Sequence, residues 1–507
     1  MSELKQKPDY NAVSFRITDG YIYLMLFFFP LFTGFEGYAN ITFSKYVFFV
    51  STTALWLISI TVCALAGGRI VCPQRRSLLG FLIILYLSVC CISSVFSPYR
   101  ASVLIGGGRF DGLVTTFLCA GIMLGVSLFA RPKISYLYAA VAAATINCVV
   151  AVLQIIGYNP LWLFPDGYGF YDAGIKFSST FFGTIGNADL FSAYICLILP
   201  FVCVHYITSE KRPLLLLPAV LALAFCLFCC GVSGGILALA VTVLLAAPFI
   251  ISGGERLRRS LELGALLSAA ALLAISFKAE MTDTAVICSL SLSRFSYLTI
   301  FLIVVAAVLR LVLRKSEFKK KTLRVFFSEL SVVLIALGFS AAYFWKGTEG
   351  SVYELSQVLH GKLEDSFGSS RILIWRKSLE LVPGHLLFGS GSGTLALRLD
   401  LSFSRYVEET GKTLSTTVDN AHNDYLGILV NTGLLSLVAY VLAQALSLIK
   451  AIKTARPVAL CLACALLCYW VQAFFGLGLF LVSPLMWLLW GLLVSSFRRS
   501  KPDIFKD

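Results

Sequence analysis

Residues 213–252 read PLLLLPAVLALAFCLFCCGVSGGILALAVTVLLAAPFIIS and contain no charged side chain. A helix that crosses a membrane needs about 20 apolar residues, because the hydrocarbon core is roughly 30 Å thick. The stretch is therefore long enough for two such helices, separated only by the turn at Gly231–Gly235. We divide it into spans at 213–231 and 233–252, and this division stays open because the separator is so short.

Apolar segments of the same kind recur along the whole chain. Of the 507 residues, 58% are hydrophobic and only 13% are charged, whereas soluble domains carry about a quarter charged residues. Such a chain has too little polar surface to coat a soluble globule. The sequence predicts an all-α polytopic membrane protein with about 14 transmembrane helices. The predicted spans are 21–35, 46–66, 78–96, 112–130, 134–156, 188–207, 213–231, 233–252, 261–277, 295–313, 328–345, 422–448, 457–479 and 482–497.

The N-terminal segment is polar for twenty residues before the first apolar run. That run is short and contains Pro30, so the limits of the first span are open. No small-residue cleavage site follows it, and we therefore expect no cleavable signal peptide.

The formal net charge of +14 could indicate a protein that binds nucleic acid. Membrane topology explains this charge better. If the N-terminus is cytoplasmic and the spans alternate, most of the 41 Lys and Arg fall in cytoplasmic segments, including the basic run 314–324. This is the positive-inside bias of membrane proteins. We expect cytoplasmic N- and C-termini, contacts with membrane lipids and no nucleic-acid partner.

Several signatures of other protein classes are weak or missing in the sequence. Most of the fifteen cysteines fall inside predicted spans, which favours buried packing over disulfides. Cys461, Cys464 and Cys468 share a helix face, but no histidine accompanies them, so a metal site there is disfavoured. The glycine-rich run Gly389–Gly393 lacks the Lys-Ser/Thr pair of an ATP-binding loop, which disfavours a primary pump.

Two segments between spans are long, 157–187 and 346–421. We divide the chain into an N-terminal bundle of about 11 spans (1–345), an extracytoplasmic loop with short helices (346–421) and about three C-terminal spans (422–507). The long loop has apolar residues at helical spacing, which predicts two amphipathic helices. Ser369 or Ser370 can cap the second of them, and Pro383-Gly384 ends it.

Arg371 begins this second loop helix, and Trp375 follows one turn later on the same face. A cation at a helix N-terminus is unfavourable unless an anion binds there, since the helix N–H groups and the guanidinium then bind one charge. Trp375 could stack on a sugar. An interfacial helix with Arg and Trp at headgroup level explains Arg371 equally well, and we prefer that explanation for Arg376 and Lys377.

The stretch DNAHNDY at Asp419–Tyr425 lies where the long loop re-enters the membrane. If Asp419 or Asn420 caps the helix, His422 lies in its first turn and is neutral near pH 7. A neutral imidazole can accept a proton from a hydroxyl. From the residues alone, a histidine that bonds the loop is the better explanation. A metal site from His422, Asp424 and Asp419 lacks further ligands.

Two other predicted outer segments are rich in glycine, GGGRFDG at Gly106–Gly112 and GTIGNAD at Gly183–Asp189. Glycine lets the backbone approach a ligand closely, and Arg109 could bind a phosphate. The alternative is turn chemistry with a local pair between Arg109 and Asp111. Asp189 would enter the lipid depth, where an ionisable group is a candidate functional residue.

Together these segments resemble the O-antigen ligase and O-antigen polymerase superfamily. The strongest match is His422-Asn423 followed, after nine residues, by Gly433; the family pattern continues Gly-x-x-Gly, but Ser436 holds the last position here. The other matching segments are Arg371–Trp375, Leu387–Gly391 and Gly183–Asn187.

In one place the sequence departs from the family. Many relatives carry Ser-Arg-Gly near the start of the span that follows the Gly183–Asn187 segment, whereas this chain has Ser233-Gly234-Gly235. An arginine that binds phosphate in those relatives is absent here or is replaced, for example by Arg109.

The resemblance implies a metal-independent, inverting glycan transferase of the bacterial inner membrane that uses no cofactor. It would transfer a glycan from an undecaprenyl-diphosphate carrier to the hydroxyl of a glycan or lipid acceptor, in a site on the extracytoplasmic face. His422 and Arg371 would be catalytic. The substrate-binding residues would be Arg109, Trp375, Arg376, Asn187, Asn423 and Asp424.

Two other functions remain as alternatives. A lipid-linked oligosaccharide flippase shares the number of spans, but it needs charges that line a central cavity, and the predicted spans are nearly free of charge. A non-catalytic scaffold for envelope assembly is the second alternative. Ligases and polymerases share their motifs, so the sequence does not choose between them.

Overall fold

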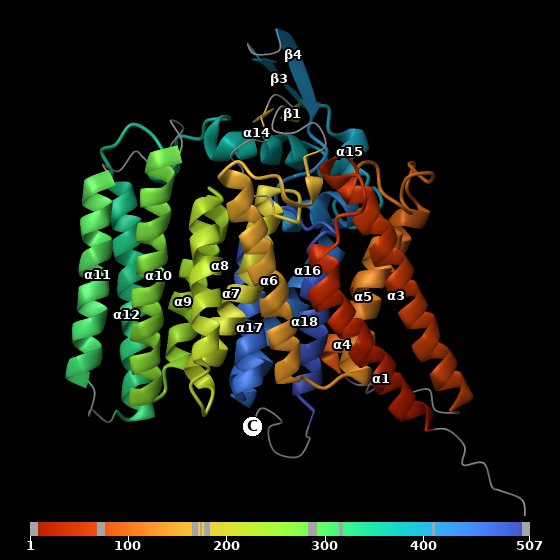
Figure 1. Ribbon diagram of the computed structural model, residues 1–507. Coiled ribbons are helices and arrows are strands. Elements are labelled where there is room, and N and C mark those ends of the chain that lie inside the picture. The colour runs from red at the N-terminus through yellow and green to blue at the C-terminus, as the bar shows by residue number, and fades with distance from the viewer. Residues whose placement is uncertain are drawn as a thin grey trace, which may run out of the picture.

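The computed structural model describes residues 9–67, 77–164, 171–172, 175–176, 183–281, 292–313, 318–407 and 411–498. Long helices run side by side, and short helices and a projecting hairpin gather at one end (Figure 1). We call this end the loop side. Helix α1 begins and α18 ends at the opposite side (Figure 1). The chain is an all-α polytopic membrane protein, as predicted.

The long helices are α1 (Tyr10–Tyr23), α3 (Ile41–Ala66), α4 (Leu78–Val95), α5 (Leu113–Phe129), α6 (Ile134–Ile155), α7 (Ala188–Thr208), α8 (Leu217–Cys229), α9 (Ser233–Ile250), α10 (Gly254–Met281), α11 (Leu292–Val312), α12 (Lys320–Tyr343), α16 (Asp424–Thr454), α17 (Pro457–Gln472) and α18 (Ser483–Ser496). The shorter elements are α2 (Phe29–Leu31), α13 (Ser351–Leu359), α14 (Phe367–Glu380), α15 (Leu395–Arg398), β1 (Tyr171–Asp172), β2 (Ile175–Lys176), β3 (Ser402–Val407) and β4 (Lys412–Thr417).

In the described part of the chain, nine helical segments are long and apolar enough to cross a membrane. Five shorter apolar helices of 10–17 residues accompany them. Each predicted span overlaps one of these segments, while the exact number of crossings stays a prediction. The open division of 213–252 is settled, since α8 ends at Cys229 and α9 begins at Ser233. Gly231 between them has φ of 76°, a left-handed conformation that suits glycine.

The helix that contains the first predicted span begins earlier than residue 21, where that span was placed with open limits. Helix α1 begins at Tyr10, where the Asp9 carboxylate accepts hydrogen bonds from two backbone N–H groups of the first turn. The polar residues of this segment are helical because they pair with α3: the Trp56 indole donates to the Thr18 hydroxyl at 3.2 Å. The helix continues through a π-helical turn into α2 and ends at Leu31. Lys45 stabilises this end by donating to the carbonyls of Phe29 and Pro30, both at 3.0 Å.

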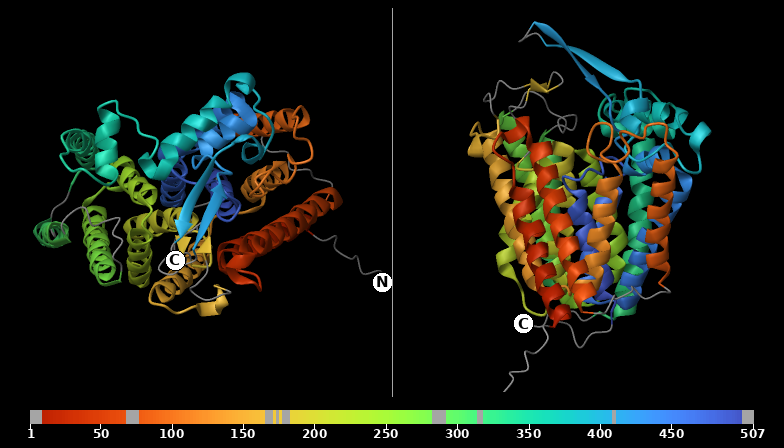
Figure 2. Two further views of the ribbon diagram at one scale, coloured as in Figure 1. Left: turned by 90° about the horizontal axis from the view of Figure 1, so that it is seen from above. Right: turned by 90° about the vertical axis from the view of Figure 1, so that its right-hand side faces the viewer.

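The helices divide into a tightly packed core and a loosely packed flank. Helix α7 lies at the centre against α17 and α9, and 89% of its most apolar window is buried. Helix α16 packs on α4, and α18 packs on α5. Helices α10, α11 and α12 form the flank at one end of the molecule (Figure 2), where only 22% of the α10 window and 11% of the α12 window are buried. The exposed apolar faces of the flank suit contact with lipid.

On the loop side, the two amphipathic helices predicted for the long loop are present as α13 and α14. The sequence did not predict the antiparallel hairpin of β3 and β4, which pairs Ser402 with Thr417 and projects away from the bundle (Figures 1 and 2).

Candidate functional site

Helix α16 is broken one third of the way along its length. Gly433 has φ of 85° and ψ of 176°, so the helix ends and restarts there. The loop after α14 enters this break: Leu434 N donates to the Leu386 carbonyl at 2.8 Å, and Gly391 N donates to the Asn431 carbonyl at 2.8 Å. A Cβ at Gly433 would lie 2.3 Å from the Leu387 carbonyl oxygen, so only glycine fits. The glycine that carries the family resemblance therefore has a structural cause.

The Asn431 side chain holds the glycine-rich loop in place. Its Oδ1 accepts from the backbone N–H groups of Thr394 at 3.1 Å and Leu395 at 2.9 Å. This loop also meets the other glycine-rich segment, because Gly107 N donates to the Gly393 carbonyl at 2.8 Å. Two segments almost 300 positions apart thus share one backbone contact beside α16.

The capping of α16 differs from the prediction. Asn423 is the N-cap, since its Oδ1 accepts from Leu426 N at 3.0 Å. His422 therefore lies before the helix, with φ of 48°, and not in its first turn. Asn420 does not cap the helix but accepts from His422 N at 3.0 Å. Asp419 does not cap it either, because its carboxylate pairs with Arg109.

Two arginine–carboxylate pairs surround His422. Arg109 Nε lies 2.7 Å from Asp419 Oδ2, and Arg371 Nη2 lies 3.6 Å from Asp189 Oδ2. Burial lowers the pKa of His422, the two arginines lower it further, and the two carboxylates oppose them. His422 is thus neutral at pH 7, as predicted, although the main cause is burial and not the helix dipole. The alternative of a local Arg109–Asp111 pair was wrong.

Arg371 follows a left-handed turn. Gly368, Ser369 and Ser370 have φ of 63°, 58° and 64°, a conformation that costs free energy for the two serines. The predicted serine cap is therefore replaced by this turn, whose Gly368 N donates to Glu354 Oε2 of α13 at 3.1 Å. Arg371 Nη1 donates to the Gly368 carbonyl at 2.9 Å, while its buried Nε has no partner among the described residues. The guanidinium keeps donor capacity for a further anion.

Comparison with protein families adds an independent observation to this geometry. Residues 282–441 match the family model described as O-antigen ligase. This interval of the chain is therefore similar to the O-antigen ligase family. This match supports the O-antigen ligase superfamily that the resemblance predicted, and with it an O-antigen ligase or polymerase type of function in polysaccharide assembly. No curated protein gives a significant match.

The matched interval contains Arg371, Asp419 and His422, whereas Arg109 and Asp189 come from the N-terminal bundle. The candidate site is therefore completed by residues outside the matched interval.

Two predicted substrate-binding residues on α14 have different surroundings. Trp375 packs against Phe474, with ring centroids 5.6 Å apart, and its buried indole N–H has no partner among the described residues. Arg376 is exposed and pairs with Asp365 at 2.6 Å. The structure places Trp375 in an aromatic cluster and leaves Arg376 apart from the charges around His422.

The predicted site residue Asn187 has a structural contact that the sequence analysis did not consider. It caps α7 by accepting from Leu190 N at 3.1 Å. The preceding turn is anchored to α6, where Asn147 accepts from Thr184 N at 2.9 Å and Gln154 accepts from Gly183 N at 3.0 Å. The turn thus fixes the start of α7, which carries Asp189 to Arg371.

The missing arginine of the O-antigen ligase pattern also has a structural explanation. A Cβ at Gly234 would lie 2.9 Å from the side chain of Phe475. The Phe475 side chain therefore occupies the space that an arginine side chain at position 234 would need. Whether Arg109 replaces this arginine stays a prediction.

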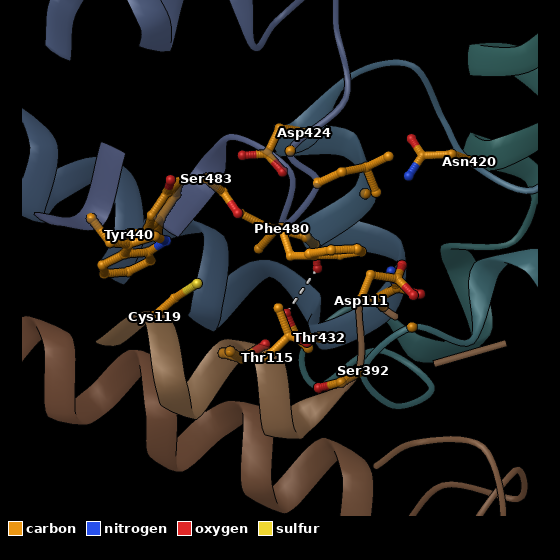
Figure 3. A pocket seen from close by; sticks show the side chains of 18 of the residues that line it. Asp111, Thr115, Cys119, Ser392, Asn420, Asp424, Thr432, Tyr440, Phe480 and Ser483 are labelled. Atoms are coloured by element: carbon orange, nitrogen blue, oxygen red, sulfur yellow. Dashed lines mark hydrogen bonds between the residues drawn. The ribbon is translucent and has the colours of Figure 1, made fainter. Parts of the chain in front are cut away.

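A cavity of about 110 Å³ adjoins the segment that carries His422 (Figure 3). It lies between α4, α5, α16 and α18, and its lining includes the predicted residues Asn423 and Asp424. The sequence analysis missed Thr115, Thr432 and Ser483 in this lining, because hydroxyl residues inside apolar spans give no signal. Asp111 also lines it, and burial raises the pKa of this carboxyl to about 6.

The described residues contain no group of three or more His, Cys, Asp or Glu that could hold a metal ion. The polar chemistry near His422 is therefore that of two arginines, their carboxylates and a neutral imidazole.

Proposed function

We propose that this protein transfers a glycan from an undecaprenyl-diphosphate carrier to an acceptor hydroxyl on the loop side, which we place outside the bacterial inner membrane. One observation carries the proposal: the ion pairs Arg109–Asp419 and Arg371–Asp189 bring two arginines from distant parts of the chain close to His422, whose pKa both arginines lower. An anionic leaving group needs cations, and an attacking hydroxyl needs a proton acceptor.

The acceptor oxygen attacks the first sugar carbon and forms the new glycosidic bond. The bond from this carbon to the diphosphate oxygen breaks, and the lipid diphosphate leaves with the electron pair. His422 takes the proton of the acceptor hydroxyl. Since attack comes from the side opposite the leaving group, the configuration at this carbon inverts, in agreement with the resemblance.

The two arginines stabilise the negative charge that develops on the leaving diphosphate. Asp419 and Asp189 orient the two guanidiniums when no substrate is bound. A diphosphate would take over part of these contacts, which is feasible because the pairs are 20–38% exposed. The diphosphate ester itself supplies the driving force, so the proposal requires neither nucleotide nor metal.

The test is transfer by purified protein in nanodiscs, with an undecaprenyl-diphosphate oligosaccharide, candidate acceptors and product analysis by mass spectrometry. Chain growth would identify a polymerase, and a single transfer to a different acceptor would identify a ligase. We expect His422→Ala to reduce transfer by about 10²–10⁴-fold, the usual contribution of a proton acceptor.

The matched control is His360→Ala. His360 also lies on the loop side, but its Nδ1 contacts the Ser356 carbonyl at 2.7 Å and its ring stacks on Tyr343. This variant should keep wild-type transfer. Full activity in a folded His422→Ala protein would refute the assigned role.

A further inference from the structure

The cavity beside His422 has a lining unlike that of an ordinary packing defect. An accidental void in a protein interior is apolar. This one is lined by two carboxylates, of Asp111 and Asp424, by several hydroxyl and amide side chains, and by the ring of Phe480 (Figure 3).

Glycines make room for both carboxylates. A Cβ at Gly106 would lie 2.4 Å from Asp111 Oδ1, and a Cβ at Gly393 would lie 2.7 Å from the same atom. A Cβ at Gly478 would lie 2.0 Å from Asp424 Oδ1. Glycines of three separate segments thus leave the space that the two carboxylates occupy. Among the described residues, no side chain donates a hydrogen bond to the Asp424 carboxylate, which leaves it available to a ligand.

Charge separates this cavity from the neighbouring arginines. Arg109 and Arg371 favour an anion beside His422, whereas Asp111 and Asp424 disfavour one inside the cavity. Carboxylates accept hydrogen bonds from hydroxyl groups, and amides such as Asn420 both donate and accept them. An aromatic face such as Phe480 packs against apolar C–H groups. A sugar ring has hydroxyl groups for the carboxylates and amides, C–H groups for the aromatic face, and no negative charge.

The size of the cavity limits the ligand. A volume of about 110 Å³ corresponds to about four waters at roughly 30 Å³ each, so part of one sugar ring can enter the cavity but a longer glycan cannot. A metal ion is disfavoured because no described group of three acidic, histidine or cysteine side chains gathers there. We propose that this cavity binds one uncharged sugar residue of the glycan substrate, which extends the proposed function by a sugar-binding pocket.

The deciding variant is Gly427→Leu. Gly427 lines the cavity on α16, and a Cβ built on it meets no atom within 4 Å. A leucine should therefore fit the helix without a clash at its Cβ and fill the pocket. The matched control is Gly338→Leu on α12, where a Cβ also meets no atom within 4 Å and the position is exposed.

Binding is measured in nanodiscs by saturation-transfer NMR with glucose, galactose, rhamnose, N-acetylglucosamine, N-acetylgalactosamine and glucuronic acid. We expect at least one neutral sugar to bind the wild type and the Gly338→Leu control, and to bind Gly427→Leu at least tenfold more weakly. Glucuronic acid should bind the wild type at least tenfold more weakly than the neutral sugar that binds best, and Asp424→Asn should reduce that difference.

Three results would overturn the proposal: no neutral sugar binds the wild type, the filled pocket binds sugars unchanged, or glucuronic acid binds as well as the best neutral sugar. Undecaprenyl diphosphate without a sugar serves as a second probe and should bind Gly427→Leu as it binds the wild type. Loss of this binding would instead assign the cavity to the diphosphate, and so also contradict a sugar pocket.

The binding experiment is independent of transfer, so the two proposals can fail separately. A wild type that binds sugar but transfers no glycan refutes the proposed function and leaves the pocket. If transfer is observed, the KM values of Gly427→Leu identify the source of the sugar: a raised KM for the lipid-linked donor assigns the pocket to the donor glycan, and a raised KM for the acceptor assigns it to the acceptor.

Discussion

Two clusters of arginines and carboxylates lie at opposite sides of the bundle. On the side away from the loops, Glu262 of α10 accepts from Tyr206 at 2.6 Å and also pairs with Arg212 and Arg310. One carboxylate is thus shared by three donors from two parts of the chain, and its side chain is only 16% exposed. On the loop side, each arginine has its own carboxylate, and the Arg371–Asp189 pair is 3.6 Å apart.

The difference separates an ion-pair cluster that joins helices from one that can bind a ligand. Glu262 connects the ends of α7, α10 and α11, so its contacts contribute to packing. Arg371 bonds only weakly to Asp189 and otherwise to a carbonyl of its own turn. We therefore expect substitutions on the loop side to reduce transfer and leave stability unchanged, and substitutions around Glu262 to reduce stability and leave transfer unchanged.

Among the variants of the two clusters, the largest expected effect is that of Arg371→Ala. The variant should reduce the kcat of glycan transfer by about 10²–10³-fold, because it removes a cation from the developing diphosphate charge. Its thermal unfolding midpoint should stay close to that of the wild type. Arg371→Lys should recover little activity, since an ammonium lacks the planar fork of a guanidinium. If the Arg371→Ala protein is stable and fully active, the loop-side cluster does not bind the diphosphate.

Glu262→Gln should show the opposite pattern. It should destabilise the fold by about 1–2 kcal/mol, less than for a fully buried ion pair because the arginine partners are 38% and 41% exposed. Thermal unfolding in nanodiscs measures this loss, and transfer per folded molecule should be unchanged. Glu255→Gln is the control, since that carboxylate is 50% exposed and should cost less. Reduced turnover in folded Glu262→Gln would give this cluster a functional role.

The pH dependence of transfer should report on His422. Its folded-state pKa is lowered from 6.5, so kcat/KM should fall only as the pH drops below 6.5, when the imidazole becomes charged and cannot accept a proton. The same sign holds for stability: the unfolded chain protonates first, so stability decreases as the pH falls below 6.5.

Asp189→Asn sharpens this test. Asp189 raises the pKa of His422, so its removal should move the acidic limb of the kcat/KM profile to lower pH. A limb that moves to higher pH, or that persists in His422→Gln, would assign the ionisation to another group.

The smallest expected effect is that of Arg376→Ala. Arg376 lies on the same helix as Arg371, but its side chain is 57% exposed in a pair with Asp365. Such a pair contributes roughly 0–1 kcal/mol to stability. We expect less than a twofold change in transfer, measured beside Arg371→Ala. A loss comparable to that of Arg371→Ala would place Arg376 in the site.

The sequence predicted the membrane architecture because each span carries its own apolar signal, and every predicted span overlaps an apolar helix. It also predicted that Arg371 and His422 would lie on one side, and the structure places both on the loop side. Local patterns were sufficient for these features.

The local geometry of the site could not be predicted in the same way. Asp419 was predicted as a possible helix cap, but its carboxylate accepts a hydrogen bond from Arg109, which lies 310 positions earlier in the chain. The start of α1 was missed because its polar side chains pair with α3. The cavity was missed because its lining comes from four helices that are far apart in the sequence. In each case a long-range partner decides the outcome.

The break at Gly433 constrains how the polypeptide can be assembled. Lipid offers no hydrogen bonds to the backbone groups that the break leaves open, and Leu386 and Gly391 supply them instead. The first turns of α16 can therefore reach their final position only after the preceding loop has folded back onto them. During biosynthesis, maturation of the residues around His422 should be a late event, and a membrane-inserted intermediate without this loop contact would have intact spans but no competent site.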